Sequence, residues 1–429
     1  MHGESDDVPS YRAIRVAAVE EPVAAMADEE AWQARERYPE LVGTSPVFGS
    51  ARELEQGGWR LHGHFGSITP QDARDALAAH FRRRARRAGE AGDEETRDAC
   101  LRAAKRLDWE AIDELTVLGE RHRVVRAENF LRMGPDGPEP PRPSDPDPAR
   151  PGTAHRLPDR TDGFVLDTAI PTGLSEALFK TELLAPAHKA GDDEAVRADT
   201  RRAAATHPGG VLLPPVFLFT EEEHGVWRRE TSHGTSPQTA RDALTMRLRV
   251  LQPAMRGLDE ATRAAYKEAA DLLDEERGVE LRFAGRHLRL VRVERLVRIG
   301  PDGPEPPRPS DFDPDPPSGI QDERLRAQGV SGEAGDGEGG AADEEEDDPE
   351  FEARMADLER LTREEMARQG RPHGAGRLSE GPGDVGNGED SGNSESGAST
   401  ESTESTESTE STESTESGEN PGGPGGDAS

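Results

Sequence analysis

The sequence predicts an α+β protein in which one module occurs twice, followed by a long acidic tail. Three observations support this prediction. The twelve-residue segment Gly-Pro-Asp-Gly-Pro-Glu-Pro-Pro-Arg-Pro-Ser-Asp stands at 134–145 and again at 300–311. Similarity between two stretches of the chain continues upstream of both segments, which is the signature of an internal repeat. Within each stretch, strand patterns of period two and helical patterns follow one another in the same order.

The repeat extends over about 125 residues in each copy. Residues 114–145 align with 280–311 without a gap, and 20 of the 32 positions are identical. Further upstream, Trp59 aligns with Trp227 and Pro70 with Pro237. We therefore expect an N-terminal segment over 1–21, a first module over 22–148, a linker over 149–162, a second module over 163–316 and a tail over 317–429.

Each module is expected to contain roughly two strands, two helices and two strands, with the helices covering one face of an antiparallel sheet. In the first copy, strands are predicted over 46–52 and 58–65, and again over 114–118 and 123–133. Thr69-Pro70-Gln71-Asp72 is typical of a helix start, with threonine as cap and proline at the first helical position. A second helix is predicted over 94–107, and the corresponding helices of the second copy begin near 236 and 260. Between the copies, 163–167 is typical of a strand and 175–184 of a helix.

Composition separates the modules from the tail. The chain carries a formal charge of −34, but 30 acidic residues against 8 arginines lie beyond residue 317, which leaves about −12 for the modules. The tail is expected to be disordered, apart from an amphipathic helix over 349–369 and six Ser-Thr-Glu triplets at 399–416. An acidic chain is a poor ligand for nucleic acid or anionic membranes, since both are polyanions.

The sequence has few signs of a particular cellular compartment. A stretch of about 20 apolar residues, which a membrane span needs, is absent, and Cys100 is the only cysteine. A single cysteine suits a reducing compartment and is more typical of a buried helix position than of a nucleophile. We therefore expect a cytoplasmic protein.

The last strand of each module carries the best candidates for ligand binding. Arg126, Glu128 and Arg132 share one strand face, and Arg292, Glu294 and Arg298 repeat the pattern. Two guanidinium groups on one face can grip a phosphate or a carboxylate. The alternative is a surface ladder of ion pairs that contributes little to stability.

The proline-rich end of each module also has two interpretations. Its prolines and arginine are Pro140, Pro141, Arg142 and Pro143 in the first copy and Pro306, Pro307, Arg308 and Pro309 in the second. Such a run favours an extended strap that closes the sheet and is stiffened by proline. It also resembles peptides that dock into aromatic-lined grooves.

Two further patterns are present in one copy only. His62 and His64 could project from one strand face, but Glu230 and Ser232 stand at these places in the second copy, and we predict no metal site. The arginines that follow Phe81 have no basic counterpart near Leu248, so a solvated helix face is favoured over a nucleic-acid site. No pattern for catalysis or for a cofactor stands out.

Several of these motifs are similar to those of an actinomycete family of unknown function. They are the proline after Glu21, Arg-Tyr-Pro ending at Pro39, Pro-Val-Phe ending at Phe48, Gly-Trp-Arg at Trp59, and the proline-rich endings. The resemblance covers roughly residues 11–316 and implies no activity. Our leading hypothesis is a non-enzymatic binding or scaffold protein with an unidentified partner, such as another protein. The alternative is a small-anion sensor or enzyme that uses the cleft between the modules and the duplicated arginines.

Overall fold

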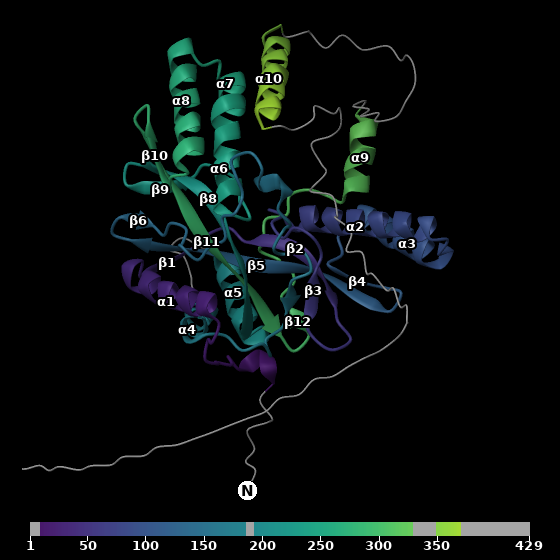
Figure 1. The fold of residues 1–429 in the computed structure, drawn as a ribbon. Coiled ribbons are helices and arrows are strands. Elements are labelled where there is room, and N and C mark those ends of the chain that lie inside the picture. The colour runs from purple at the N-terminus through teal and green to yellow at the C-terminus, as the bar shows by residue number, and fades with distance from the viewer. Residues whose placement is uncertain (1–8, 186–192, 329–348, 370–429) are drawn as a thin grey trace, which may run out of the picture. The chain divides into compact units, whose positions relative to one another are not determined.

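A computed structural model describes residues 9–185, 193–328 and 349–369. Its twelve strands form one antiparallel sheet that curls into a half-barrel. Two strands of 15 residues, β5 (Glu120–Gly134) and β11 (Arg286–Gly300), lie side by side at the centre of this sheet (Figure 1). The α+β class is thus confirmed, whereas two modules with separate sheets are not what the structure shows.

The two copies contribute the same series of elements. The first contains α1 (Pro22–Arg37), β1 (Glu40–Gly43), β2 (Val47–Glu53), β3 (Trp59–Leu61), α2 (Pro70–Glu90), α3 (Glu94–Trp109), β4 (Glu114–Val117), β5 and β6 (Gly137–Pro138). The second contains α5 (Glu194–Thr206), β8 (Gly209–Glu223), β9 (Val226–Arg229), α6 (Pro237–Met246), the π-helical η3 (Arg247–Leu251), α7 (Gln252–Arg256), α8 (Glu260–Glu276), β10 (Glu280–Phe283), β11 and β12 (Gly303–Pro304). β8 therefore spans what β1 and β2 form separately.

Six elements lie outside the repeat. They are η1 (Ser10–Arg12), η2 (Ala154–Arg156), β7 (Val165–Leu166), α4 (Leu174–Leu184), α9 (Ser318–Ala327) and α10 (Pro349–Arg368). β7 lies in the region expected to open the second module, but it pairs with β3 of the first copy. α9 packs against α3, and α10 packs against α7 and η3. Most of the tail, including the Ser-Thr-Glu triplets at 399–416, lies outside the described residues.

The helix starts follow the sequence signals. The Thr69 hydroxyl accepts the Asp72 amide at 3.1 Å, and the Asp72 carboxylate accepts the Thr69 amide at 3.2 Å. This reciprocal pair satisfies two amides that the helix leaves free, and Pro70 occupies the first helical position. In the second copy, the Ser236 hydroxyl accepts the Thr239 amide at 3.2 Å. The two helix pairs, α2 with α3 and α6 with α8, lie over different ends of the sheet (Figure 1).

The copies are joined through the pairing of β5 with β11. Phe130 faces Glu294, and Glu128 faces Leu296. Asn129 and Arg295, which are equivalent in the repeat, face each other, so a pseudo-twofold axis passes between them. Joining the central strands covers two sheet edges that separate modules would leave unpaired. One apolar core draws on both copies, with Val125 and Ala127 from the first and Val297 and Ile299 from the second.

The proline-rich straps cross from one copy to the other. The ladder between β5 and β11 has only four residue pairs, and the straps fill the places where the two strands diverge. The Glu139 amide donates to the Arg132 carbonyl, while the Glu139 carbonyl accepts the Arg292 amide, both at 2.9 Å. Glu305 makes the equivalent bonds to Arg298 and Arg126, again at 2.9 Å. The straps therefore satisfy backbone groups that would otherwise be buried without partners.

Side chains beyond the straps continue this exchange. Asp147, from the first copy, accepts the Gln238 amide at 2.8 Å and pairs with Arg241 at 2.7 Å. Asp313, from the second copy, accepts the Gln71 amide at 2.9 Å and pairs with Arg74 at 2.6 Å. The residues that follow each strap thus hold one copy to the helix start of the other, while β6 and β12 pair with β5 and β11 of their own copies, as expected of a strap that closes the sheet.

Candidate ligand-binding site

The predicted arginines and glutamates form two clusters that the pseudo-twofold axis relates. Where the two strands diverge, the backbone of Glu139 lies between Arg132 and Arg292, and the backbone of Glu305 lies between Arg126 and Arg298. We call the first group, Arg132, Arg142, Arg292 and Glu294, the open cluster. The second group, Arg126, Arg298, Arg308 and Glu128, is the closed cluster. Each contains an arginine contributed by a strap, Arg142 or Arg308.

The closed cluster satisfies its charges internally. Glu128 accepts from Arg308 at 2.7 Å, from Arg126 at 3.2 Å and from Arg298 at 3.3 Å. Arg298 also donates to the carbonyls of Leu183 and Leu184 at 3.2–3.3 Å, at the C-terminal end of α4. These three arginines lower the pKa of Glu128 by more than burial raises it. All three nitrogens of the Arg298 guanidinium are therefore hydrogen-bonded.

The open cluster repeats part of this arrangement. Arg292 donates to Glu294 and, from Nε, to Asp145 at 3.0 Å. Arg142 donates to Glu139 at 2.6 Å and reaches Glu294 at 3.4 Å. The equivalent of the Arg298–Glu128 bond, between Arg132 and Glu294, is not formed among the described contacts.

Arg132 is consequently a buried cation with one nitrogen left without a partner. Its side chain is 2% exposed, and its nitrogens reach the Glu182 carboxylate at 3.3 Å and the Tyr38 carbonyl at 3.5 Å. The 3.3 Å contact is as long as the longest contacts of Arg298, and the 3.5 Å contact is longer. The Nε of Arg132 is buried with no hydrogen-bond partner. The guanidinium lies 4.4 Å from the centre of the Phe179 ring. Burial lowers the pKa of Arg132, and that of Arg292.

A pocket of about 390 Å³ lies over the open cluster. Helices α1 and α4 form one wall, and the part of β8 around Pro214 and Pro215 forms another. The register of β8 against β11 shifts at this place, between Val293 and Arg295. Proline has no amide hydrogen to donate to a ladder, so two consecutive prolines favour such an interruption. The interruption opens the sheet surface beside Glu294.

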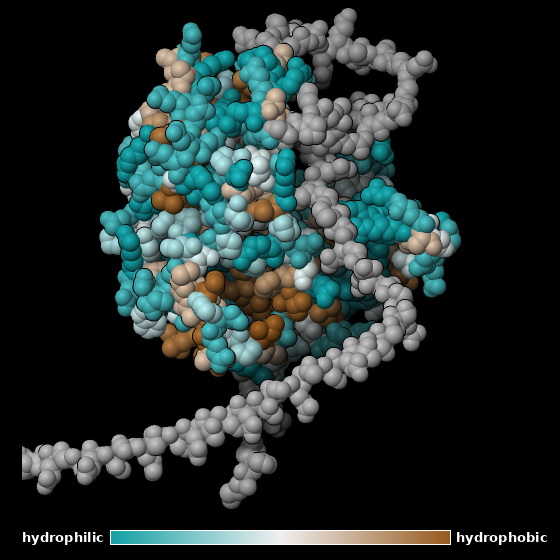
Figure 2. Space-filling model, viewed as in Figure 1, coloured by the Kyte–Doolittle hydropathy of each residue, from teal (hydrophilic) through white to brown (hydrophobic). Residues whose placement is uncertain are grey.

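The lining of the pocket combines cations with apolar surface. Its charged residues are five arginines and three acids: Arg35, Arg132, Arg142, Arg160, Arg292, Asp28, Glu176 and Glu294. Its apolar residues come largely from α1, α4 and β8 and include Ala27, Trp32, Phe179 and Leu212. A surplus of arginine in a chain of charge −34 makes this pocket a candidate for binding an organic anion. On the face shown in Figure 2, apolar residues gather mainly over its lower half, where Figure 1 places α4 and α5.

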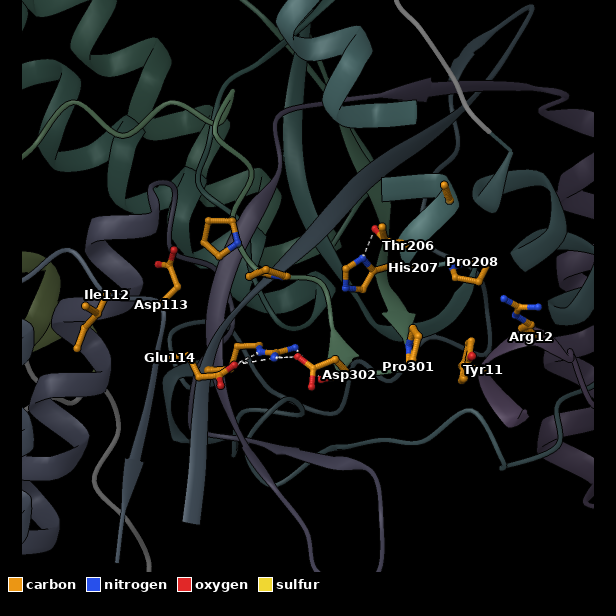
Figure 3. A pocket seen from close by; sticks show the side chains of 14 residues that line it. Tyr11, Arg12, Ile112, Asp113, Glu114, Thr206, His207, Pro208, Pro301 and Asp302 are labelled. Atoms are coloured by element: carbon orange, nitrogen blue, oxygen red, sulfur yellow. Dashed lines mark hydrogen bonds and ion pairs between the residues drawn. The ribbon is translucent and has the colours of Figure 1, made fainter. Parts of the chain in front are cut away.

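A second, larger hollow of about 700 Å³ lies beside the second strap. Tyr11, His207 and Pro208 face Asp113, Glu114 and Asp302 across it (Figure 3). Two arginines line it, Arg12 and Arg123, and Arg123 already pairs with Glu114 at 2.6 Å and contacts Asp302. The three acids of this hollow outnumber its two arginines, so it is the weaker candidate for binding an anion.

The structure assigns other partners to the histidines of the first copy. His62 stacks on His122, with their ring nitrogens 3.0 Å apart, and lies against His80. His64 instead pairs with Asp159 at 2.5 Å. Over the described ranges, no group of histidine, cysteine or acidic residues could hold a metal ion. Within the same ranges, no helix combines the length and the apolar character needed to cross a membrane.

The sequence predicted part of the site. It identified Arg132, Arg142, Arg292 and Glu294, and the structure brings these residues together. It also singled out Arg126, Glu128, Arg298 and Arg308, which gather in the closed cluster. The proposed surface ladder does not describe either group, because the four strand arginines are at most 8% exposed. It missed Arg35 and Trp32, although the spacing of Ala24, Ala27, Ala31 and Arg35 along one helical face was a usable signal.

A family model for a family of unknown function, DUF5954, matches residues 21–314. The match covers more than half of the chain. The chain belongs to this family. The matched region, residues 21–314, includes both copies of the repeat and both clusters, and ends before α9 and α10. Neither the curated proteins nor the solved structures include a significant match to the chain.

Proposed function

We propose that this member of the DUF5954 family is a non-enzymatic binding protein that takes a small organic anion in the pocket over the open cluster. The observation that carries the proposal is the state of Arg132. A buried guanidinium with an unbonded Nε is costly unless something compensates its charge. An anion in the pocket would supply the acceptor that Glu128 supplies to Arg298 in the closed cluster.

The geometry of the two strands supports a carboxylate or phosphate as the recognised group. Arg132 comes from the first copy and Arg292 from the second, so the anion would bridge both halves of the repeat. Guanidinium groups bind planar or tetrahedral oxyanions through paired hydrogen bonds. The polar groups that line the pocket are chiefly guanidinium and carboxylate groups, and its lining has no histidine or cysteine. This composition favours binding over acid–base catalysis.

The scaffold alternative has less support. In both straps the arginine of Pro-Pro-Arg-Pro is already engaged, Arg142 with Glu139 and Arg308 with Glu305, each at 2.6 Å. A docking partner would have to replace these bonds. The straps also carry backbone hydrogen bonds between the two copies.

Isothermal titration calorimetry of the full chain with a panel of carboxylates and phosphates at neutral pH tests the proposal. We expect at least one class to bind, and Arg132→Gln to weaken that binding at least tenfold. Arg298→Gln is the matched control, because it alters the equivalent arginine outside the pocket. The exposed Arg83→Gln serves as a second control that keeps the fold intact. Binding that Arg132→Gln leaves unchanged, or no binding by any anion at millimolar concentration, would contradict the proposal.

A further inference from the structure

We infer that the ligand of this pocket is an elongated amphipathic acid, with its carboxylate at Arg132 and an aliphatic chain extending along α1. This inference rests on the proposed function and concerns the part of the ligand that the arginines do not bind. It is carried by the distribution of charge and apolar surface along the pocket.

One face of α1 forms a wall of the pocket that is apolar over most of its length and ends in a cation. Ala24, Ala27 and Ala31 line the pocket, and Arg35 follows one turn later. From Ala24 to Arg35 this face extends about 16 Å, at 1.5 Å per helical residue. The small side chains leave room for a chain beside the helix. At the far end, Arg35 pairs with Glu182 at 2.6 Å, and Glu182 also contacts Arg132.

Helix α4 runs beside α1, and Ser175, Glu176 and Phe179 are its residues that line the pocket. At its start, the Asp28 carboxylate of α1 accepts the Ser175 amide at 3.1 Å. The partial positive charge of this helix end is therefore already compensated. Towards its C-terminus, Phe179 packs against the Arg132 guanidinium. The cationic group with unmet hydrogen-bonding capacity thus lies at the α4 C-terminal end of the pocket, and the small apolar wall leads away from it.

Exposed apolar residues adjoin the opposite end. Val23 is 68% exposed and Leu174 is 55% exposed, and each is next in sequence to a residue that lines the pocket, Ala24 or Gly173. Val16, which pairs with Thr172 beside them, is 53% exposed. A chain that leaves the pocket here would cover apolar surface that now faces solvent. A compact anion such as phosphate would leave both this surface and the alanine wall unfilled.

A series of carboxylates of increasing length distinguishes binding of the anionic group from binding of the aliphatic chain. We would titrate the full chain with acetate, hexanoate, octanoate and decanoate, and with inorganic phosphate, below the concentrations at which the acids form micelles. Each added methylene that becomes buried should tighten binding about fourfold, until the pocket is full. Phosphate and acetate should bind weakest.

A matched pair of variants tests where the aliphatic chain of the ligand lies. Ala27→Trp places a large side chain on the wall and should remove the gain from hexanoate to decanoate, while hexanoate keeps most of its affinity. Ala25→Trp alters an exposed position of the same helix and should leave the length dependence intact. Equal affinity for all lengths, preference for phosphate, or an unaltered length series in Ala27→Trp would overturn the inference but not the proposed function. Failure of every acid and of phosphate to bind would overturn both.

Discussion

The open and closed clusters are two versions of one arrangement, and they differ in the element that covers them. Both contain two strand arginines, one strap arginine and one glutamate. α4 has no counterpart in the first copy, and it packs over the axis, against Phe130 and Leu296. A single helix on a pseudo-symmetric surface must meet the two halves differently. It offers its last carbonyls to Arg298, whereas Arg132 meets the Phe179 ring and the Glu182 carboxylate, which Arg35 shares. The insertion of α4 therefore makes the two clusters unequal, and the pocket lies over the open cluster, whose hydrogen bonds are incomplete.

The largest expected effect concerns the two glutamates. Glu128→Gln removes the acceptor of three arginines, and we expect it to lower the free energy of unfolding by about 3–5 kcal/mol, because buried cations lose their partner. Glu294→Gln affects only Arg292 and Arg142 and should cost less. Urea unfolding of both variants measures the difference. Equal losses would show that the clusters are not energetically distinct.

Substitutions of Arg298 and Arg132 should also differ in their effect on stability. Arg298→Gln should destabilise the fold by about 2–4 kcal/mol, since it leaves Glu128 and two helix carbonyls short of donors. Arg132→Gln should cost less than about 1 kcal/mol, because it also removes a charge whose desolvation is poorly compensated. Thermal and urea unfolding without ligand check this order. A larger loss for Arg132→Gln would mean that Arg132 serves the fold rather than a ligand.

The straps allow a comparison between their glycines. Gly303 has a φ of +105°, and a Cβ there would lie 2.5 Å from the Trp59 indole nitrogen. Gly137 has a φ of +107° and meets Trp227 at 2.9 Å. Gly303→Ala should cost about 2–3 kcal/mol, and more than Gly137→Ala, because Trp59 is buried whereas Trp227 is only partly buried and can move. Urea unfolding followed by tryptophan fluorescence measures both losses of stability. A greater loss of unfolding free energy in Gly137→Ala than in Gly303→Ala would contradict this prediction.

Acid sensitivity should also differ between the copies, since the first has three histidines with a pKa lowered by burial and the second has two, His207 and His233. Burial lowers the pKa of His80 and His122 to about 4 and that of His62 to about 2. The unfolded chain binds these protons near pH 6.5, so stability should fall as the pH drops from 6.5 towards 4, by about 1–2 kcal/mol per histidine at pH 5. Copy 2 has the Glu230–Arg247 ion pair at two of these positions. His80→Gln should flatten the pH profile of urea unfolding, and an unchanged profile would show that His80 does not titrate in this range.

The sequence predicted local structure better than it predicted how the copies join. The helix starts at Thr69 and near residue 236 and the strands predicted over 114–118 and 123–133 depend on neighbouring residues, and they occur as expected. Pairing of β5 with β11 could not be predicted, because the same alternation of apolar and polar residues suits one sheet or two. Nor could the crossing of the straps, because the contacts of Asp145 and Asp311 would look alike within a copy or between copies.

The site was predictable to a similar extent. The repeat identified the arginines and glutamates, since they recur in both copies. It could not show which arginine lacks a partner, because that depends on α4, a segment outside the repeat. The contribution of α1 was visible only as a helical spacing of alanines that ends at Arg35.

The most direct test of the account follows the Arg132 Nε–H group itself. Side-chain ¹⁵N–¹H spectra, with signals assigned by comparison with Arg132→Gln and Arg298→Gln, would be recorded while octanoate is added. We expect the Arg132 signal to shift in a saturable manner as its nitrogen gains an acceptor, while the Arg298 signal stays in place. An Arg132 signal that does not move at saturating octanoate would contradict it, as would equal shifts of both signals.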